Sequence, residues 1–151
     1  MEKPVIISVR GTQQSNPEEK EDVMELVTQG VLSGSQEEGY VLSYQESELT
    51  GLEGTTTTFL VEKDKFTLRR EGSINSEMIF QVGQRHLCLY ETPYGGFMLG
   101  VNTQRAWSDL DQSGGSLSIR YIMEVENERV GENSFEIHVS EPTPSSPVVS
   151  Q

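Results

Sequence analysis

Apolar and polar residues alternate along short stretches of this chain, and turn-forming residues separate the stretches. Clusters of Gly, Pro, Asn, Asp or Ser recur every 8 to 14 residues from Gly11 to Asn133. Alternation with a period of two indicates strands with one buried face, and regular turns are typical of an antiparallel meander. The pattern predicts ten strands, over residues 4–12, 23–33, 39–49, 55–63, 66–72, 76–82, 85–92, 97–108, 116–127 and 134–140.

An open sheet of this many strands would expose two edges and a large apolar face, and closure removes both problems. We therefore predict an all-β fold, a single antiparallel up-and-down β-barrel of about 8–10 strands, of the calycin or lipocalin kind. The barrel domain spans residues 1–140. Residues 141–151 contain three prolines and no alternation, so we expect this tail to be disordered.

Two tight turns assign the strand faces. A two-residue turn at Asp64-Lys65 would place Phe59 opposite Arg70, with both on the core side, and a turn at Gly83-Gln84 would place Phe80 opposite Leu87. The alternation in the last two strands completes the set of side chains that we expect inside the barrel: Phe59, Val61, Leu68, Phe80, Leu87, Leu89, Leu117, Ile119, Tyr121, Phe135 and Ile137.

Composition supports the strands and excludes several classes of protein. The 151 residues include one Ala but 32 Thr, Val and Ile, a balance that excludes a helical bundle. The 24 Asp and Glu against 11 Lys and Arg give a net charge of −13, without the basic surface that binds phosphate backbones. Nucleic acid is therefore not an expected partner.

The sequence also indicates a cytoplasmic protein without a membrane partner. No stretch approaches the roughly 18 apolar residues of a spanning helix, and Met1-Glu2-Lys3-Pro4 leads directly into a strand-like segment with no pattern of a signal peptide. Cys88 is the single cysteine and cannot form an internal disulfide.

We expect no metal and no cofactor. The segment Asp109–Gly114 imitates the start of a calcium loop, but the twelfth position, which should be a bidentate Glu, is Arg120. His86 and Cys88 lie two residues apart, which is too few ligands for zinc, and the other histidine, His138, is distant in sequence. No phosphate loop, dinucleotide fingerprint or nucleophile elbow is present.

An ordered set of short motifs resembles a known bacterial family. The motifs are Tyr44–Ser47, Gly51–Thr55, Leu68–Gly72, Phe80 with Gly83–His86, and above all Tyr90–Gly95. Together they are similar to the family of unknown function typified by the YwiB protein, over about Val5 to Val139. The resemblance implies a calycin-like, lipocalin-resembling β-barrel of cytoplasmic bacterial origin, and it assigns no catalytic residues.

A polar set inside the barrel is the main functional candidate. If Tyr44 is buried, the same parity brings Glu46 inside beside Arg70. A buried arginine needs a carboxylate, and either Glu46 or Glu91 could supply it, with Tyr44 and Tyr121 as hydroxyl partners. The segment Tyr90–Gly96 forms either a rigid hairpin loop or a rim on which Glu91 and Tyr94 contact a ligand or partner.

Three hypotheses about function remain open. The favoured one is a barrel whose lumen binds a small polar or anionic ligand through Tyr44, Glu46, Arg70, Glu91, Tyr94 and Tyr121. The second is a non-enzymatic protein-interaction module with a filled barrel. The third is a small enzyme that uses an inward Glu as acid or base. The sequence leaves the oligomeric state and the identity of any ligand open.

Overall fold

The computed structural model describes residues 2–47 and 52–142, and ten strands and their turns make up most of this part of the chain. The all-β prediction is confirmed. The strands are β1 (Lys3–Gln14), β2 (Asp22–Ser35), β3 (Gly39–Gln45), β4 (Thr55–Val61), β5 (Phe66–Gly72), β6 (Ser76–Phe80), β7 (Arg85–Thr92), β8 (Gly95–Ser108), β9 (Gly115–Val125) and β10 (Glu128–Ser140).

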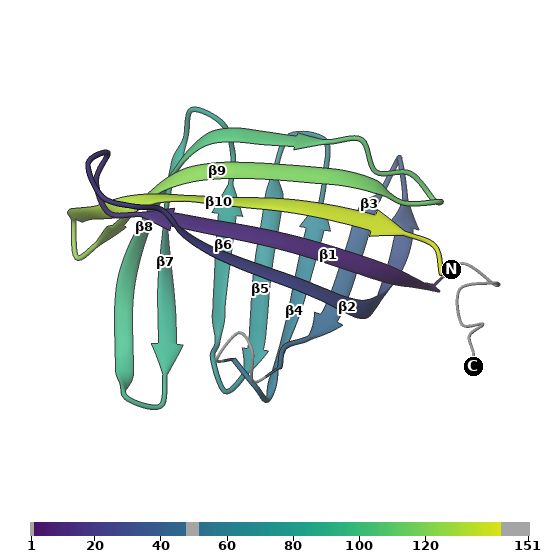
Figure 1. Cartoon of the computed structure of the whole chain (residues 1–151), viewed down its shortest axis with the longest axis horizontal. Coiled ribbons are helices and arrows are strands. Elements are labelled where there is room, and N and C mark those ends of the chain that lie inside the picture. The colour runs from purple at the N-terminus through teal and green to yellow at the C-terminus, as the bar shows by residue number, and fades with distance from the viewer. Residues whose placement is uncertain (1, 48–51, 143–151) are drawn as a thin grey trace.

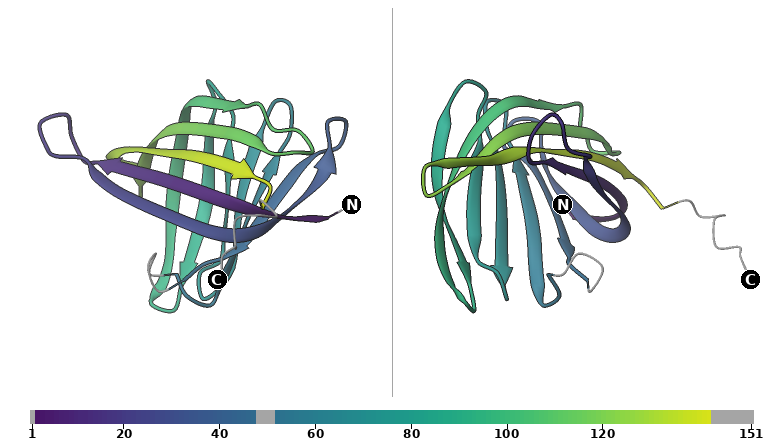
Figure 2. Two further views of the ribbon diagram at one scale, coloured as in Figure 1. Left: turned by 45° about the vertical axis from the view of Figure 1, so that its right-hand side comes forward. Right: turned by 60° about the vertical axis from the view of Figure 1, so that its left-hand side comes forward.

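The strands form one antiparallel sheet that curls into a nearly closed barrel. The sheet order is β6-β5-β4-β3-β2-β1-β10-β9-β8-β7, so nearly every strand pairs with its neighbour in sequence, and β1 also pairs with β10. Strands β9, β10, β1 and β2 cross over the upright strands, as Figure 1 shows, and the two views in Figure 2 show the wall curving round. The up-and-down prediction is therefore confirmed.

The barrel closes where β6 meets β7 and β8. Asn75 and Glu91 form an isolated antiparallel bridge, with backbone hydrogen bonds of 3.0 and 2.9 Å. Farther along the same seam, the amide of Gly83 donates to the carbonyl of Thr103 at 3.3 Å. Few backbone hydrogen bonds between described residues therefore link β6 to β7 and β8. The register between β6 and β7 depends instead on how the whole barrel closes.

The inner faces of the strands make one core with an aromatic centre. Ring centroids lie 4.9 Å apart for Phe80 and Tyr121, and 6.1 Å apart for Phe59 and Phe135. Burial of apolar area is the main favourable term for such a fold. The fully buried large side chains are Phe59, Phe80, Ile7, Leu32, Leu42, Leu68, Met78, Leu117, Ile119, Val5, Val101 and Val139.

The cross-strand pairing predicted from a turn at Asp64-Lys65 is wrong by two residues, but the strand faces are right. Val61 pairs with Phe66, and Phe59 pairs with Leu68 rather than with Arg70. The turn is centred on Lys63 and Asp64, one residue earlier than predicted, because the amide of Glu62 donates to the carbonyl of Lys65. A shift of two residues preserves the side-chain parity, so Arg70 still lies on the inner face.

The predicted faces of β7 are wrong. Leu87 and Leu89 are 57% and 50% exposed on the outside, and Cys88 is buried. The predicted turn at Gly83-Gln84 would bring Ser76 opposite Glu91, whereas the bridge joins Asn75 to Glu91. This slip of one residue inverts every side chain of the strand, and it leaves Glu91 exposed.

Some sequence expectations lie outside the described residues. These are the end of the predicted strand 39–49 and most of the predicted tail, residues 143–151. At the last described positions, Lys3 forms an ion pair with Glu141, which ties the start of β1 to the end of β10. Among residues 2–47 and 52–142, no helix is long and apolar enough to cross a membrane.

Candidate functional site

The inner wall of β3 to β6 changes from apolar to polar along the barrel. The change is visible in three cross-strand rows, each with one residue per strand. From one end of the barrel to the other, the rows are Tyr40, Val61, Phe66 and Phe80, then Leu42, Phe59, Leu68 and Met78, and then Tyr44, Thr57, Arg70 and Ser76. We call the end that holds the third row the polar end of the barrel.

Arg70 is the charged residue of this third row. Its side chain is half-buried, and its Nε is fully buried without a hydrogen-bond partner among the described residues. No ion pair between described residues includes Arg70. The predicted inward orientation is therefore correct, but the predicted Arg70–Glu46 ion pair is not formed.

Glu46 is held by hydroxyl groups instead. Thr57 Oγ1 donates a hydrogen bond to Glu46 Oε2. The Tyr44 side chain also hydrogen-bonds Glu46. Burial raises the pKa of the Tyr44 phenol well above its usual value, and Glu46 raises this pKa further, whereas the positive charge of Arg70 lowers it. Sequence parity correctly predicted that Tyr44 and Glu46 are buried together, at 7% and 8% exposure.

Tyr121 approaches the same region from β9. Burial raises the pKa of its phenol to about 12, while the positive charge of Arg70 lowers it and Cys88 and Tyr90 raise it further. The side chain is 3% exposed and lies on the inner face, where Tyr121 pairs with Thr103 and Asn133. The fold therefore unites four of the predicted site residues, Tyr44, Glu46, Arg70 and Tyr121.

Three of the four hydrogen-bond donors that are unpartnered in the described part of the chain, those of Thr55, Arg70 and Ser76, lie at the polar end. Each of the four buried side-chain atoms that lack a partner among the described residues can donate a hydrogen: Thr55 Oγ1, Arg70 Nε, Ser76 Oγ and Asn133 Nδ2. Thr55 is fully buried and Ser76 is 8% exposed. Such groups are rare in folded proteins, because a buried donor without an acceptor costs about 1–3 kcal/mol.

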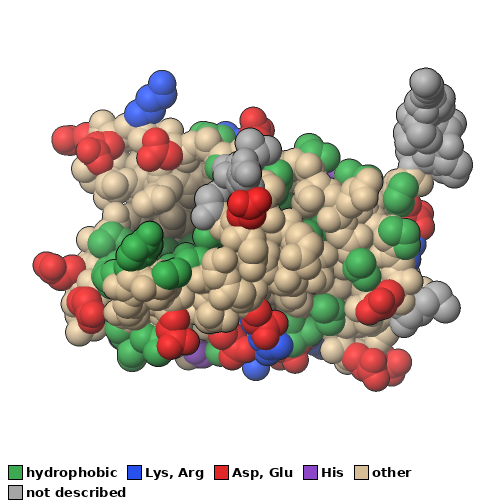
Figure 3. All heavy atoms as spheres, turned by 90° about the horizontal axis from the view of Figure 1, so that it is seen from below, with side chains coloured by type: hydrophobic (Ala, Val, Ile, Leu, Met, Phe, Trp, Pro, Cys, Tyr) green, Lys and Arg blue, Asp and Glu red, His purple; other side chains and the backbone are tan. Residues whose placement is uncertain are grey.

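A pocket opens from solvent onto the inner residues of β9 and β10. A pocket of about 240 Å³ reaches the inner residues Tyr121, Asn133 and Phe135 from the ends of β1 and β2. Seen from below, this side of the molecule is hollowed in the left half of Figure 3, next to hydrophobic side chains. A small molecule could therefore reach Tyr121, which senses the charge of Arg70, from solvent.

Two predicted residues lie away from this cluster. Glu91 is exposed at the seam, and Tyr94 is 95% exposed in the turn between β7 and β8. Sequence analysis missed Thr57 and Ser76, the two cross-strand neighbours of Arg70. Once Arg70 was assigned to the inner face, the alternation of β4 and β6 could have identified both, but hydroxyl residues are common in strands and gave no separate signal.

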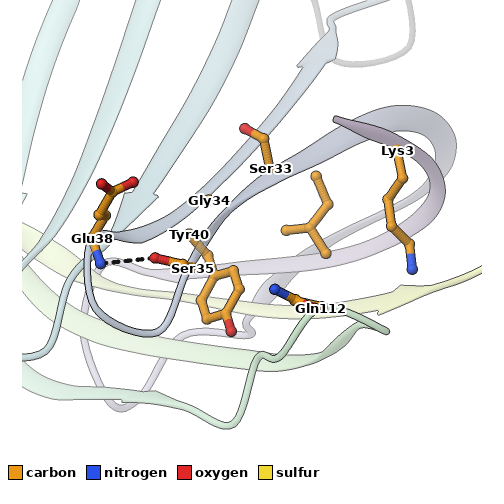
Figure 4. A pocket seen from close by; sticks show the side chains of 8 residues that line it. Lys3, Ser33, Gly34, Ser35, Glu38, Tyr40 and Gln112 are labelled. Atoms are coloured by element: carbon orange, nitrogen blue, oxygen red, sulfur yellow. Dashed lines mark hydrogen bonds between the residues drawn. The ribbon is translucent and has the colours of Figure 1, made fainter. Parts of the chain in front are cut away.

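The pocket at the opposite end lacks this chemistry. It has a volume of about 460 Å³ and includes Lys3, Ser35, Glu38 and Tyr40 among its lining residues. Figure 4 shows Ser35 Oγ accepting a hydrogen bond from the amide of Glu38, at 3.1 Å. Because Lys3 is paired with Glu141, the cation and this serine are already engaged within the protein.

No metal centre is built into the part of the chain that the structure describes. In residues 2–47 and 52–142, no group of three or more His, Cys, Asp or Glu side chains could hold an ion. Cys88 is a free, buried thiol, and burial raises its pKa. Asp111 bonds the amide and hydroxyl of Ser113, so the calcium-like segment is a local turn.

Comparison with known proteins places the chain in a family. Residues 7–137 match the model of the family described as Domain of unknown function (DUF1934). The chain is 26% identical over 128 residues to the uncharacterized beta-barrel protein YwiB of Bacillus subtilis (strain 168), covering 85% of this chain and 87% of that protein. The crystal structure of that organism's YwiB protein superposes with a TM-score of 0.81 at 25% identity and covers 94% of both chains. The resemblance seen in the sequence motifs is thus confirmed, and the chain belongs to the DUF1934 family of β-barrel proteins of unknown function.

Proposed function

We propose that the barrel binds a small anionic ligand at its polar end, with Arg70 as the main anchor. The observation that carries this proposal is the buried Arg70 Nε, which has no partner among the described residues. Ser76 lies directly opposite Arg70 on the next strand, and its hydroxyl is also buried without a partner.

The chemistry of the unpartnered atoms supports an anion rather than a cation. The three at the polar end, Thr55 Oγ1, Arg70 Nε and Ser76 Oγ, can each donate a hydrogen bond, and the guanidinium Nε cannot accept one. A carboxylate, phosphate or sulfonate group brings several acceptor oxygens. Hydrogen bonds between such a group and a guanidinium are charge-assisted and strong, especially in a partly buried site.

The packed centre of the barrel sets the size of the site. The rows that contain Phe59 and Phe80 fill the middle and the apolar end, where both side chains are fully buried. A ligand would therefore occupy only the polar end, next to the aromatic centre of the core. This geometry favours a small molecule over a long chain that threads the barrel.

Anion binding can be tested by calorimetric titration of the purified protein with acetate, succinate, phosphate and sulfate. We expect at least one of these anions to bind the wild type and to lose affinity by at least about tenfold in Arg70→Met, because the main charge-assisted bonds are removed. Arg69→Met is the matched control, since the adjacent Arg69 points outward and pairs with Glu77 at 2.8 Å. Equal affinities in wild type and Arg70→Met would disprove the proposal.

A further inference from the structure

The wall that faces Arg70 at the polar end is apolar. Tyr90 on β7 pairs with Phe97 on β8, on the same side of the hairpin as the buried Cys88 and Leu99. Val125 on β9 pairs with Leu99 and packs against the core. The inner surface at this end therefore has two chemically different halves, a polar one from β3 to β6 and an apolar one from β7 to β9.

The seam brings these two halves into contact. Asn75 and Glu91 are bridged, so the next residue on β6, Ser76, and the preceding residue on β7, Tyr90, come opposite each other in the antiparallel arrangement. Tyr90 and Arg70 also both act electrostatically on Tyr121. The unpartnered donors and the aromatic side chains thus border the same small region.

The apolar half is partly open. Phe97 is 44% exposed, although it lies on the inner side of the hairpin, whereas Leu99, two residues deeper, is 6% exposed. Covering a large exposed apolar side chain with an apolar group is favourable, because it removes apolar area from water. Ligand pockets commonly combine such apolar walls with a few polar groups that fix orientation.

We infer that the ligand is an amphipathic anion, whose acidic group binds Arg70 and Ser76 and whose aliphatic or aromatic part covers Tyr90 and Phe97. This inference rests on the proposed function and adds the second half of the ligand. The ligand is then an organic acid whose apolar body contains several carbon atoms. Inorganic phosphate and acetate would fill only the polar half.

The test compares acetate with octanoate, which share a carboxylate and differ in apolar body. Wild type should bind octanoate at least about tenfold more tightly than acetate, because the chain buries apolar area on the hairpin. Phe97→Ser should reduce the affinity for octanoate toward that for acetate and leave acetate binding unchanged. Arg70→Met should weaken the binding of both anions.

A matched variant on the outer face distinguishes binding at this site from nonspecific hydrophobic binding to the hairpin. Leu89 is on the same hairpin and is 50% exposed, but it points outward, so Leu89→Ser should leave the affinity for octanoate unchanged. An equal loss in Leu89→Ser and Phe97→Ser would overturn the inference. Equal affinities of wild type for octanoate and acetate would overturn it while the proposed function stands, and failure of both anions to bind would overturn both.

Discussion

Ser76 lies directly opposite Arg70 across the β5–β6 pair, and Ser76 Oγ and Arg70 Nε are both buried without a hydrogen-bond partner among the described residues. The strand register holds the two residues side by side on the inner face of the sheet. Sites that bind ligands often retain such groups at the expense of stability.

Arg70→Met should not destabilise the free protein. Methionine has a similar length and removes a charged group with a buried, unpartnered donor, so we expect the free energy of unfolding to stay the same or to rise by about 1–3 kcal/mol. Urea unfolding at neutral pH measures it. A decrease of more than about 2 kcal/mol would mean that Arg70 stabilises the fold through a partner, contrary to the structure.

Thr57→Val should be more costly than Thr56→Val, although the two residues are adjacent on β4. Thr57 is fully buried and donates to the Glu46 carboxylate, whereas Thr56 faces outward and bonds the Gln45 side chain at 3.1 Å. Loss of a hydrogen bond to a buried charge costs about 1–3 kcal/mol, and surface changes usually stay within about 0.5 kcal/mol. Similar values for the two variants in urea unfolding would contradict the role given to Thr57.

Stability should fall in alkaline solution because of Tyr121. Its pKa in the folded protein is about 12, above the ordinary value of 10.0 that it regains on unfolding. The unfolded chain therefore loses this proton first, and about 3 kcal/mol of stability is lost as the pH rises from about 10 to about 12. Chemical unfolding at about pH 9 and about pH 11.5 should show a smaller loss for Tyr121→Phe than for wild type. Tyr94→Phe, a change at a 95% exposed position, should behave as wild type.

The faces of the β7–β8 hairpin can be checked with two leucines. Leu99→Ala should cost about 2–5 kcal/mol, because it leaves a cavity in the core, whereas Leu89→Ala on the outside should cost less than about 1 kcal/mol. Leu99 is 6% and Leu89 is 50% exposed. Comparison of the two urea unfolding midpoints measures the difference, and the reverse order would restore the face assignment that the sequence suggested.

Sequence alone was sufficient to predict the strands and the inward orientation of most residues at the polar end. The alternation of apolar and polar residues is a local property, so β4, β5 and β9 appear close to their predicted bounds. Parity within a strand is also local. For this reason the inward orientation of Tyr44, Glu46, Arg70 and Tyr121 could be predicted, even though the predicted β4–β5 pairing was shifted by two residues.

Only the tertiary structure decided the contacts between distant segments. The β6–β7 register depends on closure of the whole barrel, since one bridge at Asn75 and Glu91 replaces a continuous ladder, and a single-residue slip inverts a strand. The partners of Glu46 depend on which groups the packed sheet leaves within reach, and they include the hydroxyls of Thr57 and Tyr44 rather than the guanidinium of Arg70. Sequence periodicity encodes which way a side chain points, whereas its partners across the barrel are determined by long-range packing.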